Sequence, residues 1–338
     1  MDAFDARLHD DVLPAFGLGG ATATRHGIGH INTTWRVDTP GGPVLAQRLN
    51  PCVFPNARAA MRNAVAVADF LAAHPGAVAV PPFLRTPEGR SWVEADGALW
   101  RMQRFVAGTA RAKVTTDDEA YAAARAFGAF QAALADYDGP PLAEHLPGFH
   151  DTPRRLQAFE AAVQADRAGR ADACRDEIDA LLERRAHAFA LADEALPTRI
   201  AHNDAKVGNV LFGDDGTVVA VVDLDTTMPG ASLADFGDLA RSASGTGDED
   251  DPDAVAFLPA RYAALSDGYL DAAGPLLTPP ERRLLGAAAQ TITYEQALRF
   301  LADHLDGDRY YAVDGPGHNL RRARAQLRLL DGMAAAGI

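Results

Sequence analysis

The 338-residue sequence has few cysteines and a deficit of positive charge. Its two cysteines, Cys52 and Cys174, follow neither a metal-ligand nor a redox spacing, so we predict buried thiols in a reducing compartment. Lysine and arginine number 32 against 46 aspartate and glutamate residues, which gives a formal net charge of -14. This charge disfavours nucleic acid and anionic membrane surfaces as partners.

Long uncharged apolar runs are also missing, so no segment is expected to span a bilayer. Residues 1–11 carry several acidic groups and lack the basic start and apolar stretch of a signal peptide, so we expect a cytoplasmic protein. Hydrophobic residues make up 48% of the chain, enough at this length to bury a large core in one domain or two lobes. The sequence carries no signal for an oligomeric state.

The first hundred or so residues are predicted to be β-rich with one main helix. Short β-prone runs separated by turn residues occur at 33–37, 44–47, 91–95 and 98–105. Between the last two runs, Asp96-Gly97 is a dipeptide typical of a hairpin turn. Residues 61–73 have the composition of a helix, and apolar residues at four-residue spacing in 4–12 predict a short amphipathic helix on the surface of this region.

After Gly108 the composition changes to alanine, leucine and arginine with helical periodicity. Helices are predicted at 119–135, 156–193, 259–272, 280–305 and 319–336. One interruption, at 209–225, has the pattern strand, turn, strand. We therefore predict an α+β fold with two lobes, a small β-rich lobe at 1–105 and a larger, mainly helical lobe at 106–338.

The motif that suggests chemistry occupies residues 202–209 and has the sequence H-N-D-A-K-V-G-N. Because the hairpin that follows folds back on itself, Asn209 at its entrance and Asp223 at its exit should lie close together. An amide and a carboxylate oxygen suit Mg²⁺, which completes its shell with water and nucleotide phosphate. Asp204 could accept a proton from a substrate hydroxyl, and Lys206 offers positive charge to a transferring phosphoryl group.

Each of these pieces, taken singly, fits an ordinary polar loop or a strand that ends at solvent. Their combination around an apolar hairpin favours the chemical interpretation. His202 is expected to brace the loop backbone. The tripeptide Asp235-Phe236-Gly237 copies a metal-binding sequence of protein kinases, but it lies well past the hairpin. We expect Asp235 and Asp238 to cap the next helix or to brace the loop.

The H-x-D-x-x-x-x-N loop and the V-V-D-L-D strand resemble the signature of aminoglycoside phosphotransferases and choline kinases, which share a two-lobed protein-kinase-like fold. A resemblance to N-acetylhexosamine 1-kinases extends over nearly the whole chain. It rests on residues 27–32, 47–50, 53–54, 149–152, 202–204, 223–226, 228–230, 299–301, 307–310 and 318–320. The resemblance implies transfer of the ATP γ-phosphate, with Mg²⁺, to the anomeric hydroxyl of an N-acetylhexosamine.

The resemblance also implies roles for individual residues. Nucleotide contacts fall to Gly27, Gly29 and Asn32 in a phosphate loop, to Gln47 and Arg48 on a strand, and to the connector residues Gln103 and Phe105. The acceptor would be held by His30, His150, Asp204, Asp225, Arg299 and Tyr310. Metal ligands would be Asn209 and Asp223, with Asp225 on a second ion or on the sugar, and catalysis would use Asp204 and Lys206.

One departure from protein kinases concerns the strand at 44–48, which lacks the lysine that usually holds the α and β phosphates. Gln47 or Arg48 could substitute for it, and Asn63 stands where the glutamate partner of that lysine is expected.

Structural roles stay open for several of these residues. The loop at 27–32 could be a plain turn, with His30 bonded to its backbone, and His150-Asp151 could cap the next helix. Arg299 could pair with Glu295 four residues earlier on a helix, and Tyr310 could be core packing. A kinase for an aminoglycoside, an amino alcohol or another sugar is the nearest rival function, and a catalytically dead binding protein is a more distant one.

Overall fold

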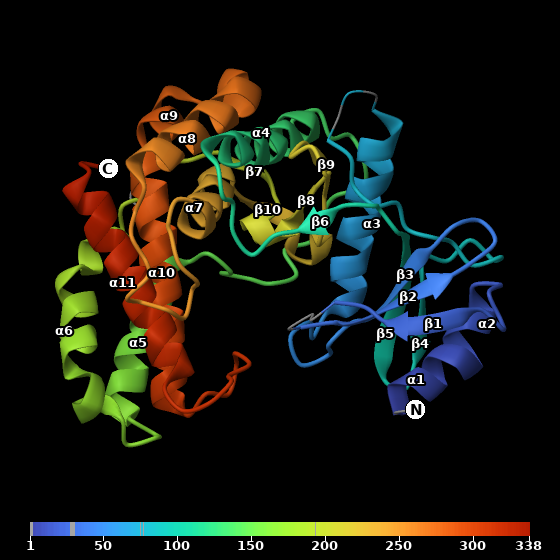
Figure 1. Ribbon diagram of the computed structural model, residues 1–338, viewed down its shortest axis with the longest axis horizontal. Helices are drawn as coiled ribbons and strands as arrows, with labels where there is room; N and C mark the ends of the chain where they lie inside the picture. The colour runs from blue at the N-terminus through green and yellow to red at the C-terminus, as the bar shows by residue number, and fades with distance from the viewer. Residues whose placement is uncertain (1–2, 28–30, 75, 77, 193) are drawn as a thin grey trace.

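The computed structural model describes residues 3–27, 31–74, 76, 78–192 and 194–338. Two lobes lie side by side in Figure 1, a strand-rich lobe from the first third of the chain and a larger helical lobe. Helix α3 (Ala57–Ala73) stands between the strands and the helical lobe. The two-lobed α+β prediction is confirmed.

The strands of the first lobe form one antiparallel sheet in the order β1-β2-β3-β5-β4. Their bounds are β1 Thr22–Arg25, β2 Thr33–Asp38, β3 Val44–Arg48, β4 Trp92–Ala95 and β5 Ala98–Arg104. Asp96 and Gly97 link β4 to β5 with φ values of 51° and 65°, as the predicted tight hairpin turn requires.

The N-terminal helices cover one face of this sheet. They are α1 (Ala3–Arg7), the π-helix η1 (Leu8–Val12) and α2 (Leu13–Ala15). Leu8 and Val12 are fully buried in a cluster with Trp35 and Trp100, whose stacked rings have centroids 5.1 Å apart. The segment predicted as a surface helix therefore supplies part of the lobe's core.

The helical lobe contains the remaining elements. Its helices are α4 Asp117–Leu134, α5 Thr152–Ala165, α6 Arg175–Glu183, α7 Ser232–Ala243, α8 Pro259–Ala273, α9 Pro279–Arg283, α10 Leu285–Asp306 and α11 His318–Ala335. Short strands are β6 Thr109–Ala110, β7 Thr198–Ala201, β8 Val210–Phe212, β9 Val218–Val221 and β10 Met228–Ala231. Strand β8 pairs with β6 and β9, whereas β7 pairs with β10. None of the described helices is both long and apolar enough to cross a membrane.

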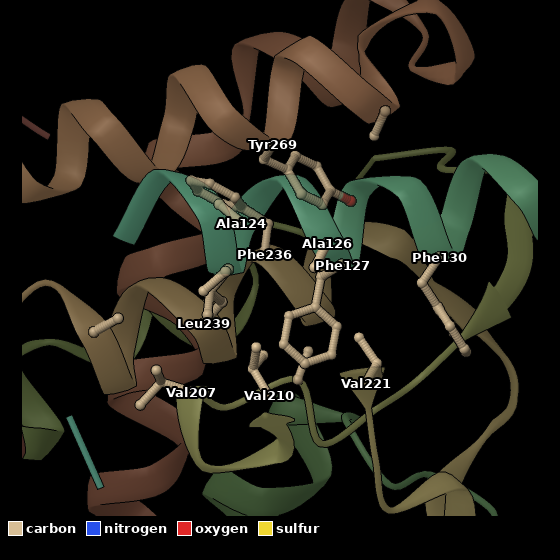
Figure 2. Close-up of a cluster of buried hydrophobic side chains, with 14 of the residues drawn as sticks. Ala124, Ala126, Phe127, Phe130, Val207, Val210, Val221, Phe236, Leu239 and Tyr269 are labelled. Carbon is tan, nitrogen blue, oxygen red and sulfur yellow. The ribbon is translucent and has the colours of Figure 1, made fainter. Parts of the chain in front are cut away.

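The core of this lobe lies where α4, α7 and α8 meet the β8–β9 hairpin. Figure 2 shows Phe127 of α4 pointing toward Val210 and Val221 of the hairpin, with Phe236 of α7 and Tyr269 of α8 nearby. All five residues are fully buried. The hairpin that carries the predicted metal ligands is thus anchored on its apolar face by the helices, which leaves its ends free to carry polar groups.

The structure corrects several local predictions. The helix predicted over 156–193 is broken after α5, because Asp166 adopts a φ of 35° and its side chain accepts hydrogen bonds from the N–H groups of Arg170 and Ala171. Helix α7 was not predicted, because Asp235, Gly237 and Asp238 within it are residue types that favour caps and turns over helix interiors. Cys174 is buried as predicted, but Cys52 is exposed in a turn after β3.

Candidate active site

The loop after β7 and the β8–β9 hairpin bring two predicted metal ligands together. Val210 pairs with Val221 across the hairpin, and the Val222 N–H donates to the carbonyl of Asn209 at 2.9 Å. Asn209 and Asp223 therefore lie at the same open end of the hairpin, as the spacing predicts.

Two residues of this region hold backbone conformations that non-glycine residues rarely adopt. Asn203 has a φ of 62° and Asp223 a φ of 65°. The Asn203 side-chain amide donates to the carbonyls of Ala201 at 3.2 Å and Thr226 at 3.0 Å, which offsets the cost of this conformation. A Cβ on Gly230 would lie 2.8 Å from Asn203 Oδ1, so this position requires glycine.

Asp235 braces the loop from α7. Its carboxylate accepts hydrogen bonds from the N–H groups of His202 at 2.9 Å and Asn203 at 2.7 Å, and from Gln131 Nε2 at 2.6 Å. The residue is fully buried, and burial raises the pKa of Asp235 despite these donors. Asp238 is occupied by Arg241, whose Nε lies 2.8 Å from its Oδ1. The protein-kinase-like tripeptide is thus a structural element here.

His202 also has a bracing role. Its Nε2 donates to the Val222 carbonyl at 3.0 Å, next to Asp223, and its ring lies against the edges of Phe127 and Phe130. The imidazole is fully buried. It therefore connects the loop to the hairpin exit and does not reach solvent or a substrate.

Asp204, Lys206 and Asn209 form a hydrogen-bonded group at the mouth of the loop. Lys206 Nζ lies 2.7 Å from Asp204 Oδ2, and Asn209 Nδ2 donates to the Asp204 carbonyl at 2.7 Å and to Oδ2 at 2.9 Å. Burial alone would raise the pKa of Asp204, but the Lys206 charge, with help from His202 and Asn209, lowers it to about 2. The Asp204 side chain is therefore a carboxylate at neutral pH.

Asn209 and Asp223 offer oxygen atoms that suit a magnesium ion. The Asn209 amide nitrogen is bound to Asp204, whereas its Oδ1 accepts no side-chain hydrogen bond among the described residues and can serve as a ligand. The Asp223 side chain is exposed and has no hydrogen-bond partner among the described residues. Although the residue keeps exposed surface, the protein atoms that surround its carboxylate and the charges of Asp225 and Asp204 raise the pKa of Asp223 to about 6. A bound cation would relieve this repulsion, so the residues present fit Mg²⁺.

Asp225 is placed differently from Asp223. It is buried and forms an ion pair with Arg101 of β5, and its Oδ2 accepts a hydrogen bond from Asn32 Nδ2 at 2.7 Å. Asn32 also accepts a hydrogen bond from the Asn50 N–H at 3.1 Å. Asn32, predicted to contact nucleotide, thus joins the first lobe to Asp225.

The strand residues predicted to replace the missing lysine point to other partners. Gln47 accepts a hydrogen bond from Arg101 Nε at 2.9 Å and donates to Thr34 Oγ1 at 3.2 Å. The Arg48 guanidinium lies over the Phe4 ring at 4.2 Å, on the side of the N-terminal helices. A phosphate contact of Arg48 therefore stays a prediction, and it would require the guanidinium to leave the Phe4 ring. Arg101 is the cation that β5 brings beside the metal end of the site.

The remaining nucleotide predictions concern the phosphate loop and the connector. Gly27 has a φ of 69°, a conformation that favours glycine, whereas Gly29 and His30 lie outside the described residues. The Gln103 side chain donates to the Pro81 carbonyl at 3.2 Å, and the Phe105 N–H donates to the Pro43 carbonyl at 3.2 Å.

Asn63 has a structural role. Its side-chain amide donates to the carbonyls of Ala143 at 2.8 Å and Thr227 at 3.0 Å, so it ties α3 to the helical lobe. Asn63 therefore does not stand in for the glutamate partner of a strand lysine.

His150 supports the loop and has no free nitrogen for a substrate. Its Nδ1 lies 2.9 Å from Glu295 Oε1, and its Nε2 lies 3.0 Å from the Asn203 carbonyl. Since both partners accept hydrogen bonds, both nitrogens carry protons. Burial lowers the pKa of His150, but the Glu295 charge outweighs it and raises the pKa. The contacts give His150 a positioning role, and its contact with a substrate stays a prediction; the helix cap is Asp151, which accepts from Arg154 N.

Arg299 is not paired with Glu295, because the carboxylate oxygens of Glu295 are bound by His150 and Thr152. The Arg299 guanidinium lies between the rings of Phe149, at 5.5 Å, and Tyr311, at 5.7 Å. The helical ion pair is therefore not formed.

Tyr310 is 57% exposed, so it is not core packing. Its loop is anchored by Asp303 of α10, whose carboxylate accepts from the N–H groups of Arg309, Tyr310 and Tyr311 at 2.8 to 3.0 Å. Asn319 Nδ2 donates to the same carboxylate at 2.9 Å, which explains a motif residue that has no direct chemical role.

The sequence did not lead us to predict that Arg101 belongs to the site or that Glu295 is the partner of His150. A signal for Arg101 was present, because an arginine within the apolar run Leu99-Trp100-Arg101-Met102 must be buried with a counter-charge. No comparable signal identifies Glu295 as the partner of His150, because 145 residues separate them.

Comparisons with known proteins support the family and the fold. The sequence profile of the phosphotransferase enzyme family matches residues 22–285. A microcompartment-associated aminopropanol kinase superposes with a TM-score of 0.67 at 15% identity, covering 99% of this chain and 98% of that chain. Choline kinase from Cryptosporidium parvum Iowa II gives 0.61 at 12% identity, covering 94% and 91%. Spectinomycin phosphotransferase, solved with ADP and spectinomycin, gives 0.57 at 12% identity, covering 97% and 98%.

The His150–Glu295 pair predicts a pH-dependent contribution to stability. A raised histidine pKa stabilises the fold fully below its ordinary value of about 6.5, and the effect is lost as pH rises through the folded-state value. The pKa of Glu295 is lowered by His150 against the effect of burial, so its contribution is lost in acid. The excess Tm of the wild type over Glu295→Gln should therefore be largest near pH 6 and should shrink toward pH 9. A constant difference between pH 6 and pH 9 would contradict the assigned charge of His150.

Asp223 and Asp235 should respond oppositely to the same substitution. Asp223→Asn should abolish Mg²⁺-dependent ATP binding without lowering Tm, because the carboxylate has no hydrogen-bond partner among the described residues and its raised pKa means that its charge does not stabilise the fold. Asp235→Asn should lower the free energy of unfolding by about 1 to 3 kcal/mol, because an amide has one acceptor oxygen for three N–H donors. Calorimetry of ATP binding and thermal melts measure both. An increased Mg²⁺ requirement in Asp235→Asn alone would reverse the assignment.

Proposed function

Because the chain belongs to the phosphotransferase enzyme family, we propose that it transfers the γ-phosphate of ATP to the anomeric hydroxyl of an N-acetylhexosamine, giving the sugar 1-phosphate. The observation that carries this proposal is the grouping of Asp204, Lys206, Asn209 and Asp223 at one end of the hairpin. A base, a cation and two oxygen ligands are the parts that phosphoryl transfer requires. A kinase for another hydroxylated acceptor is the alternative.

The nucleotide would bind between the proposed lobes, 1–105 and 106–338. At the connector, the N–H groups of Arg104 and Phe105 are used by the carbonyls of Pro82 and Pro43. Within the described residues, the next peptide groups, those of Val106 and Ala107, have no backbone hydrogen bond. These groups are the ones left to bind adenine. Gly108 follows, where a Cβ would lie 2.7 Å from Val219, so the connector packs tightly on the hairpin.

Asp204 is proposed as the base that orients and deprotonates the acceptor hydroxyl. The hydroxyl oxygen forms a bond to the γ-phosphorus while the bond from that phosphorus to the β–γ bridging oxygen breaks, and the proton passes to an Asp204 oxygen. ADP leaves with the bridging oxygen. Lys206, which now pairs with Asp204, would turn toward the phosphates when ATP binds. Without the Lys206 charge beside it, the Asp204 carboxylate becomes a stronger base, and it does so when ATP is bound and the hydroxyl proton must be accepted.

Asn209 and Asp223 would hold Mg²⁺, which neutralises charge on the phosphates when bound. The orientation of these two ligands comes from the protein alone. Asn209 is fixed through its bonds to Asp204, and the position of Asp223 is set by the backbone of the hairpin exit. A rigid ligand pair and a base joined to it by a hydrogen bond keep the transferring group and the acceptor in register.

The charges near the acceptor side support a neutral sugar over a cationic acceptor. The carboxylates of Glu295 and Asp238 are paired with His150 and Arg241. Arg299 and Arg155 are left as cations, and they lie close enough that the Arg299 charge, after burial, lowers the pKa of Arg155. Two guanidinium groups would repel the ammonium of an amino alcohol or an aminoglycoside. They can donate hydrogen bonds to hydroxyl and acetamido oxygens.

The base assignment predicts that Asp204→Asn lowers turnover by about two to four decades, the usual worth of general base catalysis. The amide keeps the shape of the side chain, so Mg-ATP affinity should stay within a few-fold of wild type. Single-turnover kinetics and calorimetric titration with ATP measure the two quantities. Turnover near the wild-type rate would refute the role of Asp204.

The acceptor assignment predicts that Arg299→Ala raises the sugar KM by roughly tenfold or more and leaves the ATP KM unchanged, since a charge-assisted hydrogen bond is worth roughly 1 to 3 kcal/mol. Arg328→Ala, an exposed arginine on α11, is the matched control and should change neither constant. The test begins with an acceptor screen read out by ADP release. If amino alcohols give ADP and N-acetylhexosamines do not, the hexosamine proposal falls and the family assignment remains.

A further inference from the structure

The segment that links β1 to β2 ends at Asn32, whose side chain contacts the other lobe. Asn32 Nδ2 donates to Asp225 Oδ2 at 2.7 Å, and Asn32 Oδ1 accepts a hydrogen bond from the Asn50 N–H at 3.1 Å. Asn32 is half-buried, and Asp225 is 2% exposed. Both ends of the Asn32 amide are therefore bound by the protein, so this side chain connects two parts of the fold.

Asp225 is a rigidly held partner for this contact. It lies in the short helix η5 (Leu224–Thr226) of the second lobe. Its Oδ1 is paired with Arg101, and its backbone carbonyl lies 2.8 Å from His145 Nε2. Because the carboxylate and the carbonyl are both held by other residues, the hydrogen bond from Asn32 fixes the position of Asn32.

The same short helix is also bonded to the loop that carries Asp204. Thr226 Oγ1 donates to the His202 carbonyl at 2.7 Å, and the Thr226 carbonyl accepts from Asn203 Nδ2 at 3.0 Å. Asp223, the proposed metal ligand, immediately precedes η5. Hydrogen bonds therefore connect the segment between β1 and β2, through η5, to both the metal ligand and the proposed base.

We propose that Asn32 is a positioning residue, whose hydrogen bond to Asp225 holds the segment between β1 and β2 beside the triphosphate of Mg-ATP. A metal ion on Asn209 and Asp223 would bring the phosphates to the hairpin exit, and Asn32 is bonded to the chain two residues beyond Asp223. Gly27, with its φ of 69°, lets the backbone of this segment approach an anion closely. The inference rests on the proposed kinase function, because it assumes that Mg-ATP binds at the hairpin exit.

The test measures nucleotide affinity of the full chain by calorimetry with Mg²⁺ and β,γ-methylene ATP at pH 8. Asn32→Ala should raise the Kd by roughly tenfold or more, because a hydrogen bond to a charged group and the alignment it provides are lost. The Kd for adenosine, which has no phosphates, should stay unchanged. Asn56→Ala removes the N-cap of α3 in the same lobe, so this control should lower Tm without changing either Kd.

An exchange of the two side chains tests the hydrogen bond itself. In Asn32→Asp two carboxylates face each other and repel, so the affinity for the Mg-nucleotide should fall as it does in Asn32→Ala. Adding Asp225→Asn restores one amide and one carboxylate. The amide at position 225 can donate to the carboxylate at position 32 and accept from Arg101, and the Asn50 N–H keeps its acceptor. The double variant should therefore recover the wild-type Kd.

The outcomes separate this inference from the proposed function. An unchanged Mg-nucleotide Kd in Asn32→Ala, or an equal loss of adenosine affinity, would overturn the inference and leave the kinase function standing. A double variant as weak as Asn32→Asp would also overturn it. If the single variants do not fold, the double variant still decides, because it keeps every hydrogen bond and should bind like the wild type. A wild type that does not bind the Mg-nucleotide would overturn both the inference and the proposed function.

Discussion

One buried carboxylate holds the loop on which the whole site depends. Asp235 of α7 accepts hydrogen bonds from the consecutive N–H groups of His202 and Asn203, which fixes two peptide groups shortly before Asp204. In the next peptide group, which leads into Asp204, His150 donates to the Asn203 carbonyl. The loop backbone is therefore held by an anion from α7 and a cation from the turn before α5. These contacts stabilise the rare backbone φ of Asn203 and offset its conformational cost.

Two ion pairs and one unpaired carboxylate have different roles in the site. Lys206 keeps Asp204 ionised, Arg101 neutralises Asp225, and the unpaired carboxylate of Asp223 is left for a cation. The Arg101–Asp225 pair also joins separate parts of the chain, since Arg101 comes from the β-rich lobe and Asp225 from the helical lobe. Electrostatic preorganisation and the connection between the lobes are thus produced by the same contacts.

The sequence predicted the parts of the site that depend on local spacing. Strand pairing across a short hairpin places Asn209 beside Asp223 whatever the rest of the fold does. Contacts between distant segments were beyond such reasoning: the partner of His150 is 145 residues away and that of Arg101 is 124 residues away. Helix α7 was not predicted because Asp235, Gly237 and Asp238 within it are residue types that favour caps and turns. The two lobes could be predicted because short β-prone runs dominate the first part of the chain, whereas hydrophobic residues recur with the period of a helix in the second.

The most direct test of the proposed function is the phosphorus NMR spectrum of the product formed from ATP, Mg²⁺ and N-acetylgalactosamine or N-acetylglucosamine. The proposed chemistry predicts ADP together with one new phosphate resonance that couples to the anomeric proton of the sugar. A new resonance coupled to any other sugar proton would contradict transfer to the anomeric hydroxyl. Consumption of ATP only when an amino alcohol or an aminoglycoside is supplied would contradict the proposed sugar acceptor.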